Sequence, residues 1–136
     1  MEYPVYYSLE EARLLLPILE EKLLKLIQIQ KALEFLSTVN VENESGGQEI
    51  DLMITKLNMK YYKKIYLYHK YIAQLLSLGV VIKDLQQGLI DFNAKYGGRD
   101  IFLCWRIGEK DIHFWHEIEE GFAGRQPIER LEKKTA

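Results

Sequence analysis

The sequence predicts an α+β fold: a long antiparallel two-helix hairpin followed by a small antiparallel β-meander of about four strands. Apolar residues recur every three or four positions in the first half of the chain, whereas apolar and polar residues alternate after residue 79. Glycine-containing turns separate the alternating segments. We expect one domain of 136 residues, with the hairpin over 1–78, the meander and a motif-rich tail over 79–127, and a flexible end over 128–136.

The first helix is predicted from its start signal and its apolar stripe. Ser8 and Glu11 have the spacing of a capping box, so the helix begins at Leu9. Pro17 lies inside the pattern and predicts either a bend or a later start, because proline lacks a backbone donor. The stripe consists of Ala12, Leu16, Leu19, Leu23, Leu26, Leu33 and Leu36.

The second helix is predicted to be apolar on two sides. It follows a loop at about 37–49, runs from about Ile50 to Leu78 and ends at Gly79, which suits a left-handed cap. One stripe holds Ile54, Leu57, Tyr61, Ile65, Tyr68, Ile72 and Leu75, and the other holds Tyr62, Tyr66, Ala73 and Leu76. Helices of nearly 30 residues are about 45 Å long, and the rest of the chain is too small to cover both stripes. We therefore expect a homodimer through the long helices.

The strands are predicted from alternation of period two. Val80–Asp84 and Leu89–Phe92 form the first pair, and a turn at 95–99 leads to a third strand over Asp100–Arg106. Ile112–His116 is the expected fourth strand.

Composition narrows the functional classes. A net charge of −2 disfavours nucleic acid and anionic membranes as partners of the whole molecule. No apolar run approaches the roughly 18–20 residues that cross a bilayer, and the opening residues do not resemble a secretory leader. Cys104 is the single cysteine, which excludes an intramolecular disulfide and a four-cysteine zinc site. We expect a cytoplasmic protein.

Reactive side chains are concentrated between Leu103 and Pro127. This segment holds both tryptophans, two of the three histidines, two arginines and several glycines. Trp105 and Trp115 are expected to pack in the core or an interface. Cys104 alternates with Trp105 and is expected to face the core.

Three motifs occur together in the chain: Ser-x-Glu-Glu-Ala at the start of the first helix, Gly-Val-x-x-Lys-Asp…Gly-Leu-x-Asp-Phe in the first hairpin, and Leu-Cys-Trp-Arg-x-Gly-Glu…Trp-His-Glu…Gly-Phe-Ala-Gly-Arg-Gln-Pro in the tail. With them nearly the whole chain resembles the prokaryotic domain-of-unknown-function family 2203. The resemblance implies no particular activity. It implies that His116 is a stronger site candidate than His113, which falls at a variable position of the family. Asn93 stands where the family often has proline.

Six polar residues are the candidates for a small ligand site: Asp91, Arg106, Glu109, His116, Glu117 and Arg125. The histidine is expected to act as a switchable donor or ligand, and the carboxylates to orient it. Arg106 and Arg125 have the paired donors that hold a small anion such as phosphate or carboxylate. The alternative for these arginines is structural, an ion pair with Asp91 or Glu117 that fastens the tail to the sheet.

The leading functional interpretation is an uncharacterised cytoplasmic homo-oligomeric binding or interaction module, whose small polar site lies near the C-terminal motif. One alternative is a metal-assisted hydrolase that uses the same site. No cofactor is expected, because the chain lacks a recognised metal signature; if a divalent metal binds, its ligands are His116, Asp91 and Glu117. A second alternative is a nucleic-acid-associated protein that uses the lysines and tyrosines of the second helix. Whether the protein is an enzyme stays open.

Overall fold

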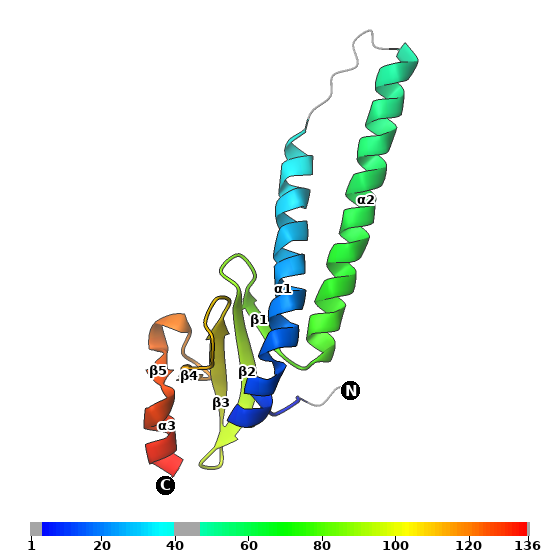
Figure 1. Cartoon of the computed structure of the whole chain (residues 1–136). Coiled ribbons are helices and arrows are strands. Elements are labelled where there is room, and N and C mark those ends of the chain that lie inside the picture. Colours follow the sequence, from blue (N-terminus) through cyan, green and yellow to red (C-terminus); the bar gives the residue numbers. More distant parts are fainter. Residues whose placement is uncertain (1–3, 40–46, 136) are drawn as a thin grey trace.

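The computed structural model describes residues 4–39 and 47–135, and it confirms the predicted α+β class. Two long helices come first, and an antiparallel sheet follows them (Figure 1). The elements in chain order are α1 (Leu9–Thr38), α2 (Gly47–Ser77), β1 (Val81–Asp84), β2 (Leu89–Tyr96), β3 (Arg99–Arg106), β4 (Phe114–Glu117), the 3-10 turn η1 (Phe122–Gly124), β5 (Gln126–Pro127) and α3 (Ile128–Thr135).

The sheet has five strands in the order β1-β2-β3-β4-β5, one more than the expected number of about four. The additional strand, β5, pairs Gln126 with Trp115 and Pro127 with Phe114 of β4. A proline cannot donate to a ladder and is tolerated at the edge of a sheet, where β5 lies. A two-residue strand that contains proline leaves no alternation to recognise in the sequence.

The β2–β3 hairpin is longer than predicted, because its turn consists of Gly97 and Gly98 alone. Both glycines have positive φ, 59° and 77°, which two-residue hairpin turns favour. The ladder therefore continues to Tyr96 opposite Arg99. It also places Asp91 directly opposite Cys104, on one face of the sheet.

The core lies between one face of the sheet and the N-terminal half of α1 (Figure 1). The predicted capping box starts α1: the Ser8 hydroxyl accepts from the Glu11 amide, and the Glu11 carboxylate accepts from the Ser8 amide. The helix continues through Pro17, so the expectation of a later start was wrong. Buried members of the core include Ala12, Leu16, Leu19, Leu23, Leu26, Ile90, Phe92, Ala94, Ile101, Leu103, Trp105 and Trp115. The two tryptophans are thus core residues, as predicted.

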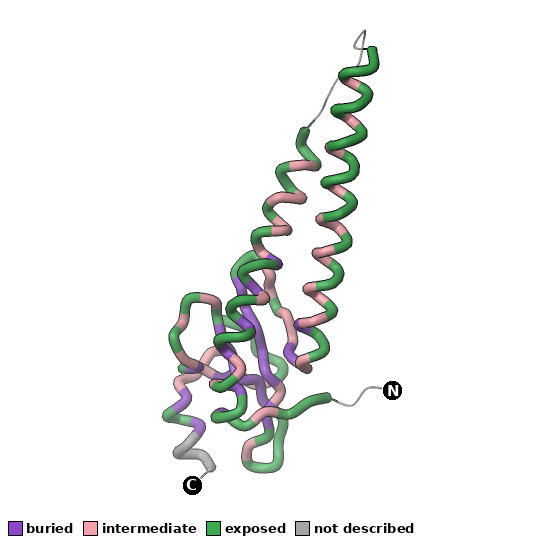
Figure 2. The backbone as a smooth tube through the Cα atoms, turned by 45° about the vertical axis from the view of Figure 1, so that its right-hand side comes forward, coloured by how far each residue is buried: buried purple, intermediate pink, exposed green. Residues whose placement is uncertain are grey.

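Beyond the sheet, α1 and α2 project together as a stalk (Figures 1 and 2). Past Leu26 no described residue of α1 is buried, and α2 has one buried residue, Leu75, near its sheet end. The Lys22 ammonium donates to the Gln74 side chain at 3.0 Å and links the two helices. The apolar stripes of the stalk are therefore only partly covered by each other.

Element boundaries differ from the predictions mainly at the helix ends. Helix α2 begins at Gly47, earlier than about Ile50, and Gly79 has the expected positive φ of 81°. Residues 40–46 of the predicted loop lie outside the described residues. Within the tail that was expected to be flexible, 128–136, residues Ile128–Thr135 form α3. Ile128 and Leu131 of this helix are buried in the core.

No helix within the described ranges combines the length and the apolar character of a membrane span.

Candidate functional site

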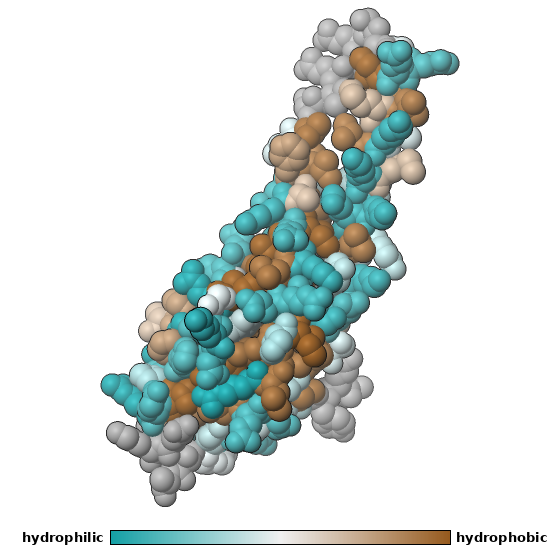
Figure 3. Space-filling view, in the orientation of Figure 1, coloured by the Kyte–Doolittle hydropathy of each residue, from teal (hydrophilic) through white to brown (hydrophobic). Residues whose placement is uncertain are grey.

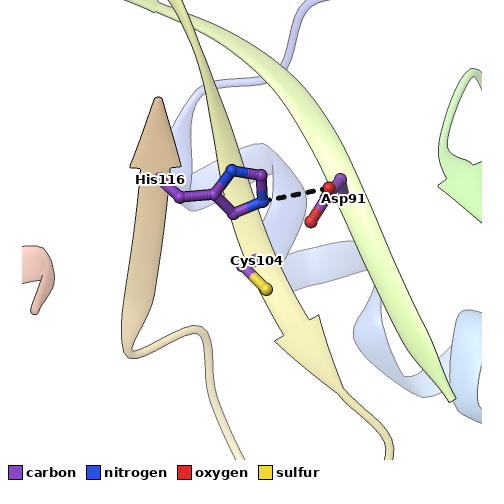
Figure 4. Close-up of side chains that lie close together, drawn as sticks. All are labelled: Asp91, Cys104 and His116. Carbon is purple, nitrogen blue, oxygen red and sulfur yellow. Dashed lines mark hydrogen bonds and ion pairs between the residues drawn. The ribbon is translucent and has the colours of Figure 1, made fainter. Parts of the chain in front are cut away.

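The face of the sheet that points away from α1 carries a buried polar cluster. Asp91, Cys104 and His116 are 1%, 2% and 1% exposed, and none of them belongs to the apolar core cluster. They come from three neighbouring strands, β2, β3 and β4, and their side chains point toward one another (Figure 4). We call these three residues the buried triad.

Two hydrogen bonds fix the position of the His116 ring in the triad. His116 donates from Nε2 to Asp91 Oδ2 at 3.0 Å and from Nδ1 to the Glu117 carbonyl oxygen at 2.8 Å. One potential ligand atom from each triad residue lies within 4.8 Å of the other two. The second carboxylate oxygen, Asp91 Oδ1, is buried and has no hydrogen-bond partner among the described residues. Buried polar atoms are usually satisfied, so this oxygen calls for an explanation.

The surroundings of His116 favour its protonated form. Burial alone disfavours the charged imidazolium. Hydrogen bonds with Asp91, Cys104 and the Glu117 carbonyl favour it, as does the negative charge of Asp91. The balance raises the pKa of His116 from 6.5 to about 10. A proton on both ring nitrogens agrees with the geometry, because both of their partners are acceptors.

We expect the metal-free protein to lose stability as the pH rises from about 6.5 toward about 10. The folded protein keeps its His116 proton over this window while the unfolded chain releases it, so the contribution is complete below 6.5 and is lost near 10. Asp91, Cys104 and Lys83 are the titratable groups that face the ring. Urea unfolding with a chelator present, compared with His116→Gln at each pH, isolates the contribution. A difference between the two proteins that stays constant with pH would contradict the assignment.

Lys83 closes the triad on the solvent side. Its ammonium lies 4.0 Å from Asp91 Oδ2 and 5.0 Å from the ring centroid of Phe102. The Phe102 ring in turn lies 5.4 Å from the His116 ring. Because the Lys83 side chain is 42% exposed, the triad is separated from solvent there by a flexible side chain.

A second polar group, centred on Arg125, lies beside the triad on the same face. Arg125 donates to Glu109 at 2.7 Å and to the Cys104 carbonyl oxygen at 3.4 Å. Its guanidinium also stacks 4.1 Å from the centroid of Phe114 and 4.7 Å from that of Phe122. The Glu109 carboxylate accepts the Arg106 amide as well, at 2.6 Å. These contacts favour the structural alternative for Arg125, in which its side chain fastens the tail to the sheet.

Arg125 forms its ion pair with a different residue from the two that were expected. The sequence hypothesis pairs an arginine with Asp91 or Glu117, whereas Arg125 pairs with Glu109. The Glu117 side chain lies on the opposite face of the sheet and pairs with Arg99 at 2.7 Å, so it does not join His116 as a ligand. The Arg106 side chain is exposed, with its guanidinium 6.0 Å from the Phe122 ring.

Sequence reasoning missed Cys104 and Lys83. Cys104 was expected to face the core, but Trp105 takes that face and the cysteine points the other way. A signal for its placement is present in the sequence. Counting six residues back from Gly97 and six forward from Gly98 pairs Asp91 with Cys104, once the turn is taken as two residues. His113, which was ranked below His116, is exposed at the surface.

The chemistry that the triad can perform follows from its atoms. Carboxylate, thiol and imidazole together form a donor set that suits zinc and related divalent ions. Without a metal, the same atoms form a buried ion pair with a neighbouring thiol, and such a pair gives specificity of packing more than stability.

Comparison with known proteins places the chain in a family. No curated protein and no solved structure matches it. A family model described as "Uncharacterized conserved protein (DUF2203)" matches residues 5–128, which is most of the chain and confirms the resemblance seen in its motifs. The protein therefore belongs to this family of uncharacterized conserved proteins.

Proposed function

We propose that the protein is a cytoplasmic homodimeric binding module, in which the α1–α2 stalk joins two copies and the sheet end carries a polar ligand site. One observation carries the assembly part of this proposal: the exposed side of α2 bears an apolar stripe with the seven-residue repeat of a coiled coil. A reduced, buried Cys104 agrees with a reducing compartment.

The stripe falls on the two core rows of a heptad, although the second row also holds the polar residues Thr55 and His69. Its members, spaced by seven, three, four, seven and three residues, are Leu52, Met59, Tyr62, Tyr66, Ala73 and Leu76. Met59, Tyr62 and Tyr66 are 68%, 67% and 66% exposed, although side chains of these types are enriched in the centres of protein interfaces. A repeat of 3.5 residues keeps a seam facing a partner helix along its whole length.

Lysines border the apolar stripe at the same seven-residue spacing. Lys56, Lys63 and Lys70 are seven residues apart, and all three are exposed. Each of these lysines comes four residues after a stripe residue. In a coiled coil, charged residues at this position border the apolar contact between the helices. This arrangement accounts for three of the five lysines of α2 without a nucleic-acid partner.

The size of the stalk suits a second copy of the chain. The stripe extends over about 36 Å and the hairpin is about 20 Å wide, so one face offers on the order of 700 Å². Stable interfaces bury roughly 800 Å² per partner. Brown, apolar side chains reach the surface along the stalk in Figure 3, as expected for a two-helix unit that another hairpin completes into a four-helix bundle. A twofold axis presents the same stripe from both copies.

Sedimentation equilibrium tests the assembly. We expect a mass of twice the 16.0 kDa of one chain at micromolar concentration. Replacing Met59 and Tyr66 with glutamate places two charges in the seam and is expected to produce a monomer that keeps its sheet. The matched control is Lys60→Glu, which changes the net charge by the same two units at an exposed position outside the stripe.

A wild-type chain that stays monomeric at about 100 micromolar would contradict the proposed dimer. So would a Met59→Glu/Tyr66→Glu variant that remains dimeric, because the seam would then lie elsewhere.

A further inference from the structure

We propose that the buried triad of Asp91, Cys104 and His116 is a binding site for a zinc-like divalent metal ion. The proposal rests on the proposed function in one respect, since it names the ligand class of the polar site at the sheet end. It does not depend on the dimer, because all three residues come from one chain.

The donor set is the first argument. One ligand atom from each residue lies within 4.8 Å of the others, so small side-chain movements bring all three to the metal–ligand distances of about 2.0–2.3 Å. Thiolate and imidazole favour zinc and cobalt over magnesium and calcium, which prefer oxygen alone. Three protein ligands leave a fourth position of the tetrahedron open.

The unpartnered oxygen of Asp91 is the second, independent argument. Asp91 Oδ1 is buried without a hydrogen-bond partner in the described part of the chain, and its residue is 1% exposed. Figure 4 shows the Asp91 carboxylate directed toward His116 and Cys104. A cation between the three side chains would satisfy this oxygen, which the metal-free packing leaves unsatisfied.

The orientation of His116 is the third argument. Its Nδ1 donates to the Glu117 carbonyl at 2.8 Å, which directs Nε2 into the triad. Histidines that bind metals usually hold their second nitrogen in this way. When the ion binds, it takes the places of the Nε2 proton and the thiol proton, and both protons leave to solvent. The three ligands then carry two negative charges, which balance the ion.

A metal ion can reach the buried triad beside the Lys83 side chain. Its ammonium lies 4.0 Å from Asp91 Oδ2, farther from this carboxylate than His116 Nε2 at 3.0 Å. The side chain is half-exposed, so it can turn into solvent when a divalent ion replaces it beside Asp91. This gives the buried triad an entry path.

Cobalt titration of the tag-free, chelator-treated and reduced protein tests the site. Thiolate bound to Co²⁺ gives a sulfur-to-metal charge-transfer band in the near ultraviolet. Because Cys104 is the single cysteine, such a band reports on this residue alone. We expect the band to saturate at one equivalent per chain, independently of protein concentration, and to disappear when zinc is added.

Variants separate the triad from chance binding. Cys104→Ser keeps the size of the side chain and is expected to abolish the band, and His116→Gln is expected to weaken binding about 100-fold or more. The matched control is His113→Ala, which removes an exposed histidine three residues away and is expected to leave the titration unchanged. If Cys104→Ser does not fold, protection of the wild-type thiol from alkylation by one equivalent of zinc replaces it.

A folded wild-type protein that shows no band and no protection overturns the proposal. A band that needs more than one chain per metal also overturns it. The monomeric Met59→Glu/Tyr66→Glu variant is expected to bind cobalt as the wild type does, so failure of the metal site and failure of the dimer are distinguishable.

Discussion

Replacing His116 with alanine is expected to lower the free energy of unfolding of the metal-free protein by about 3–5 kcal/mol. The substitution removes the donor that lies 3.0 Å from Asp91 Oδ2 and leaves a carboxylate in a site that is 1% exposed. Removing one member of a buried ion pair is costly because the remaining charge loses its partner without regaining water. Urea unfolding at pH 6.5 with a chelator measures the loss.

The control for this prediction is the neighbouring histidine. His113→Ala removes the same side chain from an exposed position and is expected to change the free energy of unfolding by no more than about 0.5 kcal/mol. A double-mutant cycle then tests the pair itself. Asp91→Ala/His116→Ala should cost less than the two single changes together, since the double variant leaves no unpaired charge. Additive losses would show that the two side chains are not coupled.

Replacing Arg125 with alanine is expected to cost about 2–3 kcal/mol, the second large effect. The guanidinium holds Glu109 at 2.7 Å and stacks between Phe114 and Phe122, so its loss frees the tail that covers this face. Arg125→Lys is expected to recover little, because an ammonium cannot stack on two rings and bind a carboxylate at once. Thermal or urea unfolding is the measurement.

Arg99 provides the matched comparison. Its ion pair with Glu117 has the same 2.7 Å length, but the side chains are 48% and 32% exposed, against 12% and 21% for Arg125 and Glu109. Arg99→Ala is therefore expected to cost no more than about 1 kcal/mol. If Arg125→Ala were as stable as the wild type, Arg125 would be free to act as an anion clamp and the structural role would be wrong.

The fold was predictable wherever a local pattern was long enough to recognise. The capping box at Ser8, the two helical stripes and the alternation in three strands are all signals within one element. Strand β5 and helix α3 were missed because both are short: β5 has two residues, one of them proline, and α3 has eight. Their placement depends on β4, which they pack against or pair with.

The candidate site was predictable as a list of residues but not as an arrangement. Of the six candidates, Asp91 joined His116 and Glu109 joined Arg125, whereas Glu117 turned to the other face. Asp91 and Cys104 were connected by a countable two-glycine turn. His116 was not, because the irregular segment 107–113 precedes β4 and sets no register that can be counted.

The sequence by itself determined the two long helices, the existence of strands β1 to β3 and the family of the chain. These depend on hydrogen bonds and side-chain periods within a few residues, which are visible along the chain. Only the tertiary structure decided that His116 joins Asp91 and Cys104, and that Arg125 is held by Glu109. Both outcomes depend on the register between strands, and a shift of one residue would turn every side chain of a strand to the opposite face.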